Sequence, residues 1–77
     1  MFNASGIIPH HKKKLKYIFL ILETARCKDE VDVYGLELHD LKGDRKGDWA
    51  VSVSGNWRVT FRFIENDVEL LDYEDYH

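Results

Sequence analysis

Two segments in which apolar and polar residues alternate constrain the fold of this chain most strongly. Residues 49–54 and 57–63 both carry apolar side chains at odd positions, which is typical of strands with one buried face. Gly55-Asn56 between them is a turn sequence, so the pattern predicts an antiparallel hairpin. A two-residue loop would pair odd with even positions and mix the two faces. We therefore expect a three-residue connection with Gly55 or Asn56 in the left-handed conformation.

Two weaker strands flank this hairpin in the sequence. Residues 36–39 alternate, and residues 68–73 follow a turn at 65–67, although their pattern does not fix a register. A charged segment bracketed by two glycines, residues 42–48, is a predicted turn. The chain should thus form a four-stranded antiparallel sheet. Its polar face would carry the even-numbered side chains of the hairpin, which are Ser52, Ser54, Arg58, Thr60 and Arg62.

One long helix is predicted before the strands, over about residues 9–26. Its apolar residues recur at three- and four-residue spacing, and Pro9 suits the first turn. Six consecutive apolar residues, 17–22, surround this helix, so a second helix or another chain should cover the side that faces away from the sheet. Residues 27–35 read as a loop. We predict an α+β fold in which residues 1–77 form one domain, with the helix on one sheet face and the other face open.

Composition limits the compartment and the partners. The single Cys27 excludes an internal disulfide and a multi-cysteine zinc site, and the apolar run is too short for a secretory or membrane-spanning segment. We therefore expect a cytoplasmic protein. A net charge of −3 gives no general support for nucleic-acid binding. A basic cluster does occur near the start, although charge patterning alone favours a solvated helix end; it comprises Lys12, Lys13, Lys14 and Lys16.

Metal-free cleavage of a phosphodiester is the chemistry that these residues suit best. His39, Asp75 and His77 are possible metal ligands, but no histidine pair has a helical ligand spacing, so we predict no metal and no cofactor. Nucleophile-elbow and phosphate-loop motifs are missing from the sequence. Attack of an RNA 2′-hydroxyl needs an acid, a base and cations that stabilise the phosphorane. Residues that supply these groups are His39, Lys42, Arg58, Asp75 and His77.

Each of these assignments has a plainer alternative. Tyr76 and Trp57 are able to stack on RNA bases, yet the odd position of Trp57 also suits the core. Arg58 and Arg62 are able to balance acidic residues on neighbouring strands. The residues alone therefore do not decide between two functions, that of a ribonuclease and that of a plain binding module.

Three ordered motifs resemble the HigB toxins, plasmid-maintenance killer proteins of the RelE superfamily. They are Leu38-His39-Asp40-Leu41-Lys42-Gly43, the hairpin segment 49–63, and the terminal Asp72-Tyr73-Glu74-Asp75-Tyr76-His77. The resemblance implies a RelE-like fold and a type II toxin that cleaves messenger RNA in the ribosomal A site. It also implies a HigA-like helix-turn-helix antitoxin as partner.

The resemblance further implies roles for individual residues. His39 and Lys42 match the family's first catalytic pair, and Arg58 matches its phosphate-contacting arginine. Asp75, Tyr76 and His77 match the C-terminal active-site cluster, in which we expect His77 to be the principal acid and base. The basic residues from Lys12 to Lys16 would face ribosomal RNA, and Arg62 is a further predicted RNA contact.

The front of the chain departs from the family pattern, which begins with a strand and a first helix. Residues 1–6 match at most the end of that helix. An N-terminally shortened fold would expose a sheet edge and the second apolar side of the predicted helix, so we expect self-association. The alternative function is then a catalytically inactive homologue that binds only an antitoxin or itself.

Overall fold

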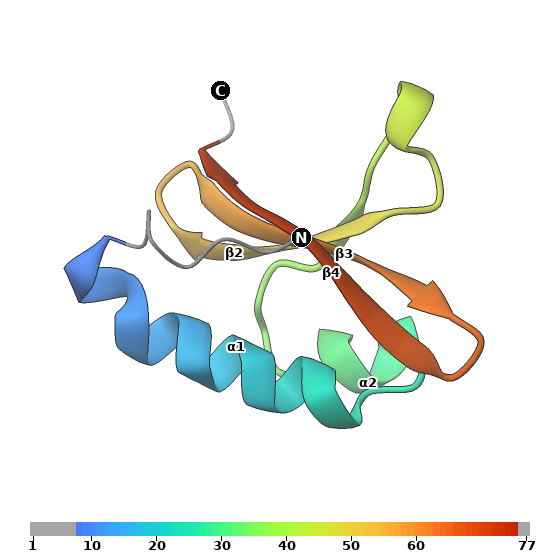
Figure 1. Cartoon of the computed structure of the whole chain (residues 1–77), viewed down its shortest axis with the longest axis horizontal. Coiled ribbons are helices and arrows are strands. Elements are labelled where there is room, and N and C mark those ends of the chain that lie inside the picture. The colour runs from blue at the N-terminus through green and yellow to red at the C-terminus, as the bar shows by residue number, and fades with distance from the viewer. Residues whose placement is uncertain (1–7, 76–77) are drawn as a thin grey trace.

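Four antiparallel strands and one long helix make up residues 8–75, the part of the chain that this computed structural model describes (Figure 1). A 3-10 turn, η2 (Pro9–His11), leads into α1 (Lys12–Thr24), and a short α2 (Lys28–Asp32) follows. The sheet has the order β1-β2-β3-β4, and α1 lies across one face. Its strands are β1 (His39–Asp40), β2 (Trp49–Ser54), β3 (Trp57–Ile64) and β4 (Asp67–Asp75). The predicted α+β fold is confirmed.

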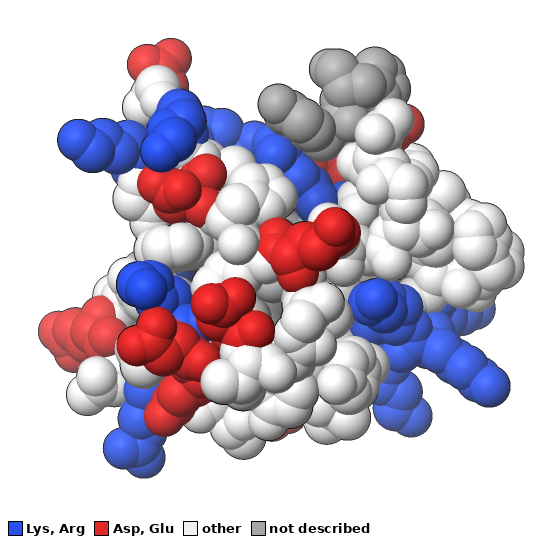
Figure 2. Space-filling model, turned by 180° about the vertical axis from the view of Figure 1, so that it is seen from behind, with Lys and Arg blue, Asp and Glu red and all other residues white. Residues whose placement is uncertain are grey.

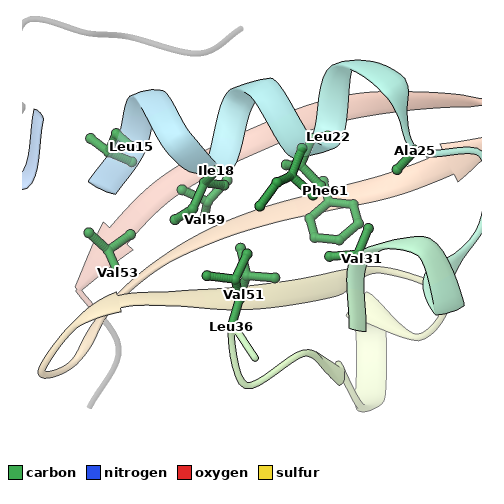
Figure 3. Close-up of a cluster of buried hydrophobic side chains, with 11 residues drawn as sticks. Leu15, Ile18, Leu22, Ala25, Val31, Leu36, Val51, Val53, Val59 and Phe61 are labelled. Atoms are coloured by element: carbon green, nitrogen blue, oxygen red, sulfur yellow. The ribbon is translucent and has the colours of Figure 1, made fainter. Parts of the chain in front are cut away.

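The hydrophobic core lies between α1 and the sheet (Figure 3). Helix α1 contributes side chains at the predicted helical spacing, and the strands contribute the odd positions of β2 and β3. Its buried members include Leu15, Ile18, Leu22, Val51, Val59 and Phe61. The apolar residues at helical spacing in α1 and the alternating apolar residues of β2 and β3 therefore pack against each other in one core, as expected for a helix on a sheet.

Helix α2 was not predicted, because residues 27–35 were expected to form a loop. Its Val31 is completely buried in the core, together with Leu36. Five residues are too few to produce a helical repeat of apolar positions, so the sequence pattern gave no signal. Cys27, just before α2, is exposed rather than packed as a small hydrophobic residue.

The predicted three-residue hairpin loop is wrong, but the predicted separation of the faces is right. Ser54 lies opposite Trp57, which leaves two residues in the loop, and the register shifts between Ser52 and Ser54. This β-bulge adds one residue to β2. Beyond the bulge, odd positions of β2 lie opposite odd positions of β3, as in the pair Val51 and Val59. Gly55 has the expected positive φ, 56°.

Replacing Gly55 with alanine should lower the free energy of unfolding by about 1 kcal/mol, because an L side chain is strained at positive φ. Apart from the adjoining residues of the chain, no heavy atom lies within 4 Å of the added Cβ, so the cost is conformational rather than a clash. Asparagine tolerates this conformation better, and Gly55→Asn should therefore cost less. Urea unfolding of both variants checks this prediction, and equal losses would contradict it.

A second bulge explains why alternation did not fix the register of β4. Thr60 lies opposite Asp72 whereas Phe61 lies opposite Leu70, so Leu71 is the extra residue. The residues that pack on the core consequently change from even to odd positions along β4, from Val68 and Leu70 to Tyr73. The strand is also longer than the predicted 68–73, whereas β1 is shorter than the predicted 36–39.

The sheet face opposite α1 is partly covered, not open as predicted. Residues 40–48 project from this side of the sheet and include a second 3-10 turn, η3 (Gly43–Arg45), whose Arg45 reaches Glu74 on β4. The Leu41 amide donates to the Asp48 carbonyl at 2.9 Å, and Asp48 pairs with Arg62 at 3.2 Å. Thr60 and Arg58 belong to this polar side of the sheet and are nevertheless buried. A cleft rather than a flat surface therefore results.

A buried histidine joins the start of α1 to the end of β4. His11 Nδ1 lies 2.7 Å from the Tyr73 hydroxyl, which also accepts a hydrogen bond from the Ile8 amide at 3.3 Å. Burial and the charge of His10 both lower the pKa of His11, which favours the neutral ring in this hydrogen bond. Trp57 stacks on Tyr73 at 4.7 Å, so the core-packing interpretation of Trp57 is confirmed.

The outer side of α1 retains exposed apolar side chains, as the six-residue apolar run predicted. Tyr17 and Leu20 are exposed on α1, and Val33 and Tyr34 are exposed next to α2. Tyr17 contacts Tyr34 edge to face at 6.3 Å. Within residues 8–75, no helix has the length and apolar character that crossing a bilayer requires.

Candidate active site

A cleft of about 490 Å³ is lined by Arg58, which alternates along β3 with the core residues Val59 and Phe61, so the cleft lies on the sheet side away from α1. It is bounded by β1, the segment around η3, and β3. Its lining residues are His39, Asp40, Leu41, Lys42, Arg45 and Arg58. Three of the predicted catalytic residues therefore share one cavity: His39 and Lys42 from neighbouring positions of one segment, and Arg58 from β3. Arg45 was not predicted.

His39 is held in one tautomer by the backbone before it. Its Nδ1 lies 2.9 Å from the carbonyl oxygen of Glu37, which accepts hydrogen bonds and donates none. Nδ1 therefore carries the proton in the neutral ring, and the Nε2 lone pair remains available to accept a proton or bind a cationic donor. Glu37 itself has a φ of 57°, a left-handed conformation that turns the chain just before His39. The exposed ring can thus serve as a base.

Lys42 makes a loose ion pair at the rim of the cleft. Its Nζ lies 3.1 Å from Asp40 Oδ2, and the Lys42 side chain is 84% exposed. The hydrogen bond from Lys42 is the main reason that the pKa of Asp40 lies below its usual value. Exposed pairs of this kind stabilise a fold very little. The ammonium group is therefore able to turn from Asp40 toward a phosphate without loss of structure.

Arg58 is fixed by Glu74 on the neighbouring strand. The Nε and Nη2 of Arg58 donate to Glu74 Oε2 at 2.8 and 2.6 Å, and the Arg58 side chain is 9% exposed. Arg45 Nη1 donates to the same carboxylate at 3.2 and 3.0 Å. Burial alone would raise the pKa of Glu74, but the hydrogen bonds and charges of both arginines outweigh it and lower that pKa.

Replacing Glu74 with glutamine should lower the free energy of unfolding by about 1 to 2 kcal/mol at pH 7, because it weakens the support of a buried guanidinium. The Glu74 pKa is lower in the folded state, so its contribution is complete above its ordinary value of 4.5 and is lost as the pH falls through the folded value. The difference from the wild type should therefore shrink in acid, as measured by urea unfolding across pH.

Glu69→Gln is the matched control for this substitution. Glu69 lies 3.8 Å from Arg62 on the same pair of strands, but its side chain is 51% exposed. Its replacement should change the stability by less than about 0.5 kcal/mol. Equal effects of the two substitutions, or a Glu74→Gln effect that grows in acid, would contradict the assigned role of Glu74.

The predicted C-terminal cluster is described in part. Asp75 is exposed at the end of β4, opposite Trp57, and follows directly after Glu74. Tyr76 and His77 lie outside the described residues. The pairing of Arg58 with Glu74 nevertheless brings the last described residues of the chain beside the strand that carries Arg58.

The predicted RNA-contacting residues do not form one surface. Lys12, Lys13, Lys14 and Lys16 are exposed on the first turns of α1. In Figure 2 the start of α1 lies at the right, while the basic side chains around η3 lie at the upper left. Arg62 pairs with Asp48 and Glu69, as the charge-balancing alternative predicted. The helix lysines and the cleft therefore occupy opposite sides of the molecule.

Neither Glu74 nor Arg45 was identified from the sequence. Glu74 follows the β4 bulge, so its face was unknown until the register was known. Arg45 lies in a charged turn in which no alternation distinguishes one charge from the next.

Within residues 8–75, no group of three histidine, cysteine, aspartate or glutamate side chains is placed to hold a metal ion.

Comparisons with known proteins match almost the whole chain. Residues 3–77 match a family described as the RelE-like toxin of the type II toxin-antitoxin system HigB. The chain is also 48% identical over 74 residues to a protein of Proteus vulgaris named Endoribonuclease HigB. This alignment covers 96% of the chain and 80% of the relative.

Proposed function

The chain belongs to the RelE-like toxins of the type II toxin-antitoxin system HigB, and on this premise we propose that it is a ribosome-dependent endoribonuclease that cleaves messenger RNA by metal-free acid and base catalysis. The family resemblance predicted from the sequence is thereby confirmed. Support for the enzyme class comes from the name of the Proteus vulgaris relative, Endoribonuclease HigB. Its substrate would be messenger RNA in the ribosomal A site.

The observation that carries this proposal is the convergence of His39, Lys42 and Arg58 in one cleft beside the end of β4. Cleavage begins when a 2′-hydroxyl attacks the adjacent phosphorus, and the bond to the 5′-oxygen then breaks. One group must take the proton of the hydroxyl, and another must give a proton to the leaving oxygen. Cations must stabilise the charge of the phosphorane between these steps.

Roles follow from the chemistry of each group. His77 is the principal acid and base, assisted or oriented by Asp75, while Tyr76 positions the substrate. Lys42 and Arg58 stabilise the phosphorane, and His39 is the second proton carrier or a phosphate ligand. Support for the role of His39 comes from its fixed tautomer, which leaves Nε2 as the accepting nitrogen.

The proposed partners are those of a type II toxin in the cytoplasm. A HigA-like helix-turn-helix antitoxin would bind the free toxin, and the ribosome would present the messenger. Lys12, Lys13, Lys14 and Lys16 would contact ribosomal RNA through their charges, on the side of the molecule away from the cleft. Arg62 would add a weaker RNA contact, because it is already paired with two carboxylates.

The exposed apolar residues favour a second candidate function, that of a binding module without activity. Tyr17 and Leu20 on α1 and Val33 and Tyr34 just after α2 are exposed, with Tyr17 in contact with Tyr34, and β4 is an edge strand of the described sheet. Both features promote association with an antitoxin or with a second copy of the chain. A well-folded monomer at high concentration would contradict the self-association part of this alternative.

Induction of the chain in bacteria, with mapping of new 5′ ends on a translated messenger, separates the two functions. The wild type should arrest growth and produce new ends, whereas His77→Ala and Lys42→Ala should do neither. Growth without arrest and a messenger without new ends would defeat the proposed enzyme.

A further inference from the structure

We propose that Arg45 is a further catalytic residue, which contacts the scissile phosphate together with Arg58. This assignment rests on the proposed ribonuclease function. Arg45 lines the cleft with Arg58 and Lys42, and its side chain is 38% exposed. The side chain is therefore accessible to a substrate in the cleft while part of it remains packed.

The position of Arg45 is determined by its backbone as well as by its side chain. The Arg45 amide donates to the Lys42 carbonyl at 3.3 Å, and the Arg45 carbonyl accepts from the Asp48 amide at 3.0 Å. The loop is closed by the hydrogen bond from Leu41 to Asp48. A side chain that leaves such a hydrogen-bonded turn starts from a fixed point, which is a requirement for precise contact with a reacting group.

Glu74 brings the guanidinium groups of Arg45 and Arg58 to one carboxylate. Two cations at such short range repel each other, and the shared carboxylate offsets this repulsion. The three groups together carry a charge of +1, so the site still attracts an anion. A phosphodiester resembles a carboxylate in presenting two oxygens that can accept hydrogen bonds, and the planar guanidinium fits such pairs.

The two arginines differ in how they are held. Arg58 uses Nε and Nη2 for Glu74 and is almost completely buried, whereas both contacts of Arg45 with Glu74 use Nη1. The Nε and Nη2 groups of Arg45 can therefore donate to a phosphate while Nη1 keeps its hydrogen bonds to Glu74. Glu74 thus acts as a positioning residue, and Arg45 provides donors from the η3 side of the cleft.

The test measures single-turnover cleavage of ribosome-bound messenger at saturating protein concentration. Arg45→Gln should slow the cleavage step by on the order of tenfold to a hundredfold, because a hydrogen bond to a charged group is lost. Arg45→Lys should restore part of the rate, since it keeps the charge without the planar fork. Arg26→Gln is the matched control; it removes an exposed arginine at the end of α1 and should leave the rate unchanged.

A substrate with sulfur in place of one non-bridging oxygen of the scissile phosphate separates direct contact from a structural role. The rate penalty of Arg45→Gln should shrink on one of the two stereoisomers if Arg45 binds that oxygen. A lower melting temperature with unchanged saturating rates would overturn the assignment, and so would equal penalties on all substrates. Cleavage by the wild type with no effect of Arg45→Gln rejects this inference alone, whereas no cleavage by the wild type rejects the proposed function and this inference together.

Discussion

Lys42→Ala should slow cleavage of messenger RNA by about a hundredfold to a thousandfold, the range found when one preorganised electrostatic donor is removed from an active site. Lys42 is highly exposed and makes one weak ion pair with Asp40, so its removal should leave the stability almost unchanged. A large loss of rate without a loss of stability would place the ammonium group at the reacting phosphate. Single-turnover cleavage and urea unfolding measure the two quantities separately.

Lys46→Ala is the control for Lys42→Ala, because Lys46 is an exposed lysine of the same loop that does not line the cleft. It should reduce the rate by less than about threefold through long-range attraction of RNA, an effect that salt screens. Equal losses for the two variants would mean that the loop attracts RNA by charge alone, and would contradict a catalytic role of Lys42.

Phe61→Ala should lower the free energy of unfolding by about 3 to 5 kcal/mol, because it removes a large buried side chain and leaves a cavity. Phe61 is completely buried beneath α1 (Figure 3). Its ring also contacts that of Phe63 edge to face. Small domains are only marginally stable, with total stabilities near the low end of about 5 to 15 kcal/mol. The variant should therefore be largely unfolded at 37 °C, as judged by circular dichroism.

Ile64→Ala provides the comparison for Phe61→Ala on the same strand. Ile64 is exposed at the end of β3, and its truncation should cost less than about 1 kcal/mol. Similar losses for the two variants would show that the core does not lie where β3 meets α1.

The strand pattern predicted those parts of the fold in which one face is buried throughout. Val51, Val59 and Phe61 alternate with polar residues, and α1 repeats its buried side chains at helical spacing, so the helix, the hairpin and the face that each buries followed from the sequence. The two β-bulges did not, because an added residue changes which positions face the core without changing composition. For that reason the sequence pattern predicted neither the length of the hairpin loop nor the register of β4.

The candidate site was predictable where a residue type restricts the chemistry. His39, Lys42 and Arg58 were proposed from the family resemblance, and the structure places all three in one cleft. Arg45 and Glu74 were missed because their importance arises from contacts between β4 and the η3 turn, more than twenty residues apart in the chain. No local pattern carries information about such a pair, and like-charged neighbours in the sequence obscure it.

The chemistry of the cleaved ends tests the central claim, that the cleft cleaves RNA by attack of the 2′-hydroxyl with acid and base catalysis. Purified protein is mixed with ribosomes that carry a translated messenger, and the products are compared for a normal message and one with a 2′-deoxynucleotide at the cleavage site. The account predicts new 5′-hydroxyl ends on the normal message and no cleavage at the deoxy position. New 5′-phosphate ends, or cleavage of the deoxy message at the same place, would contradict it.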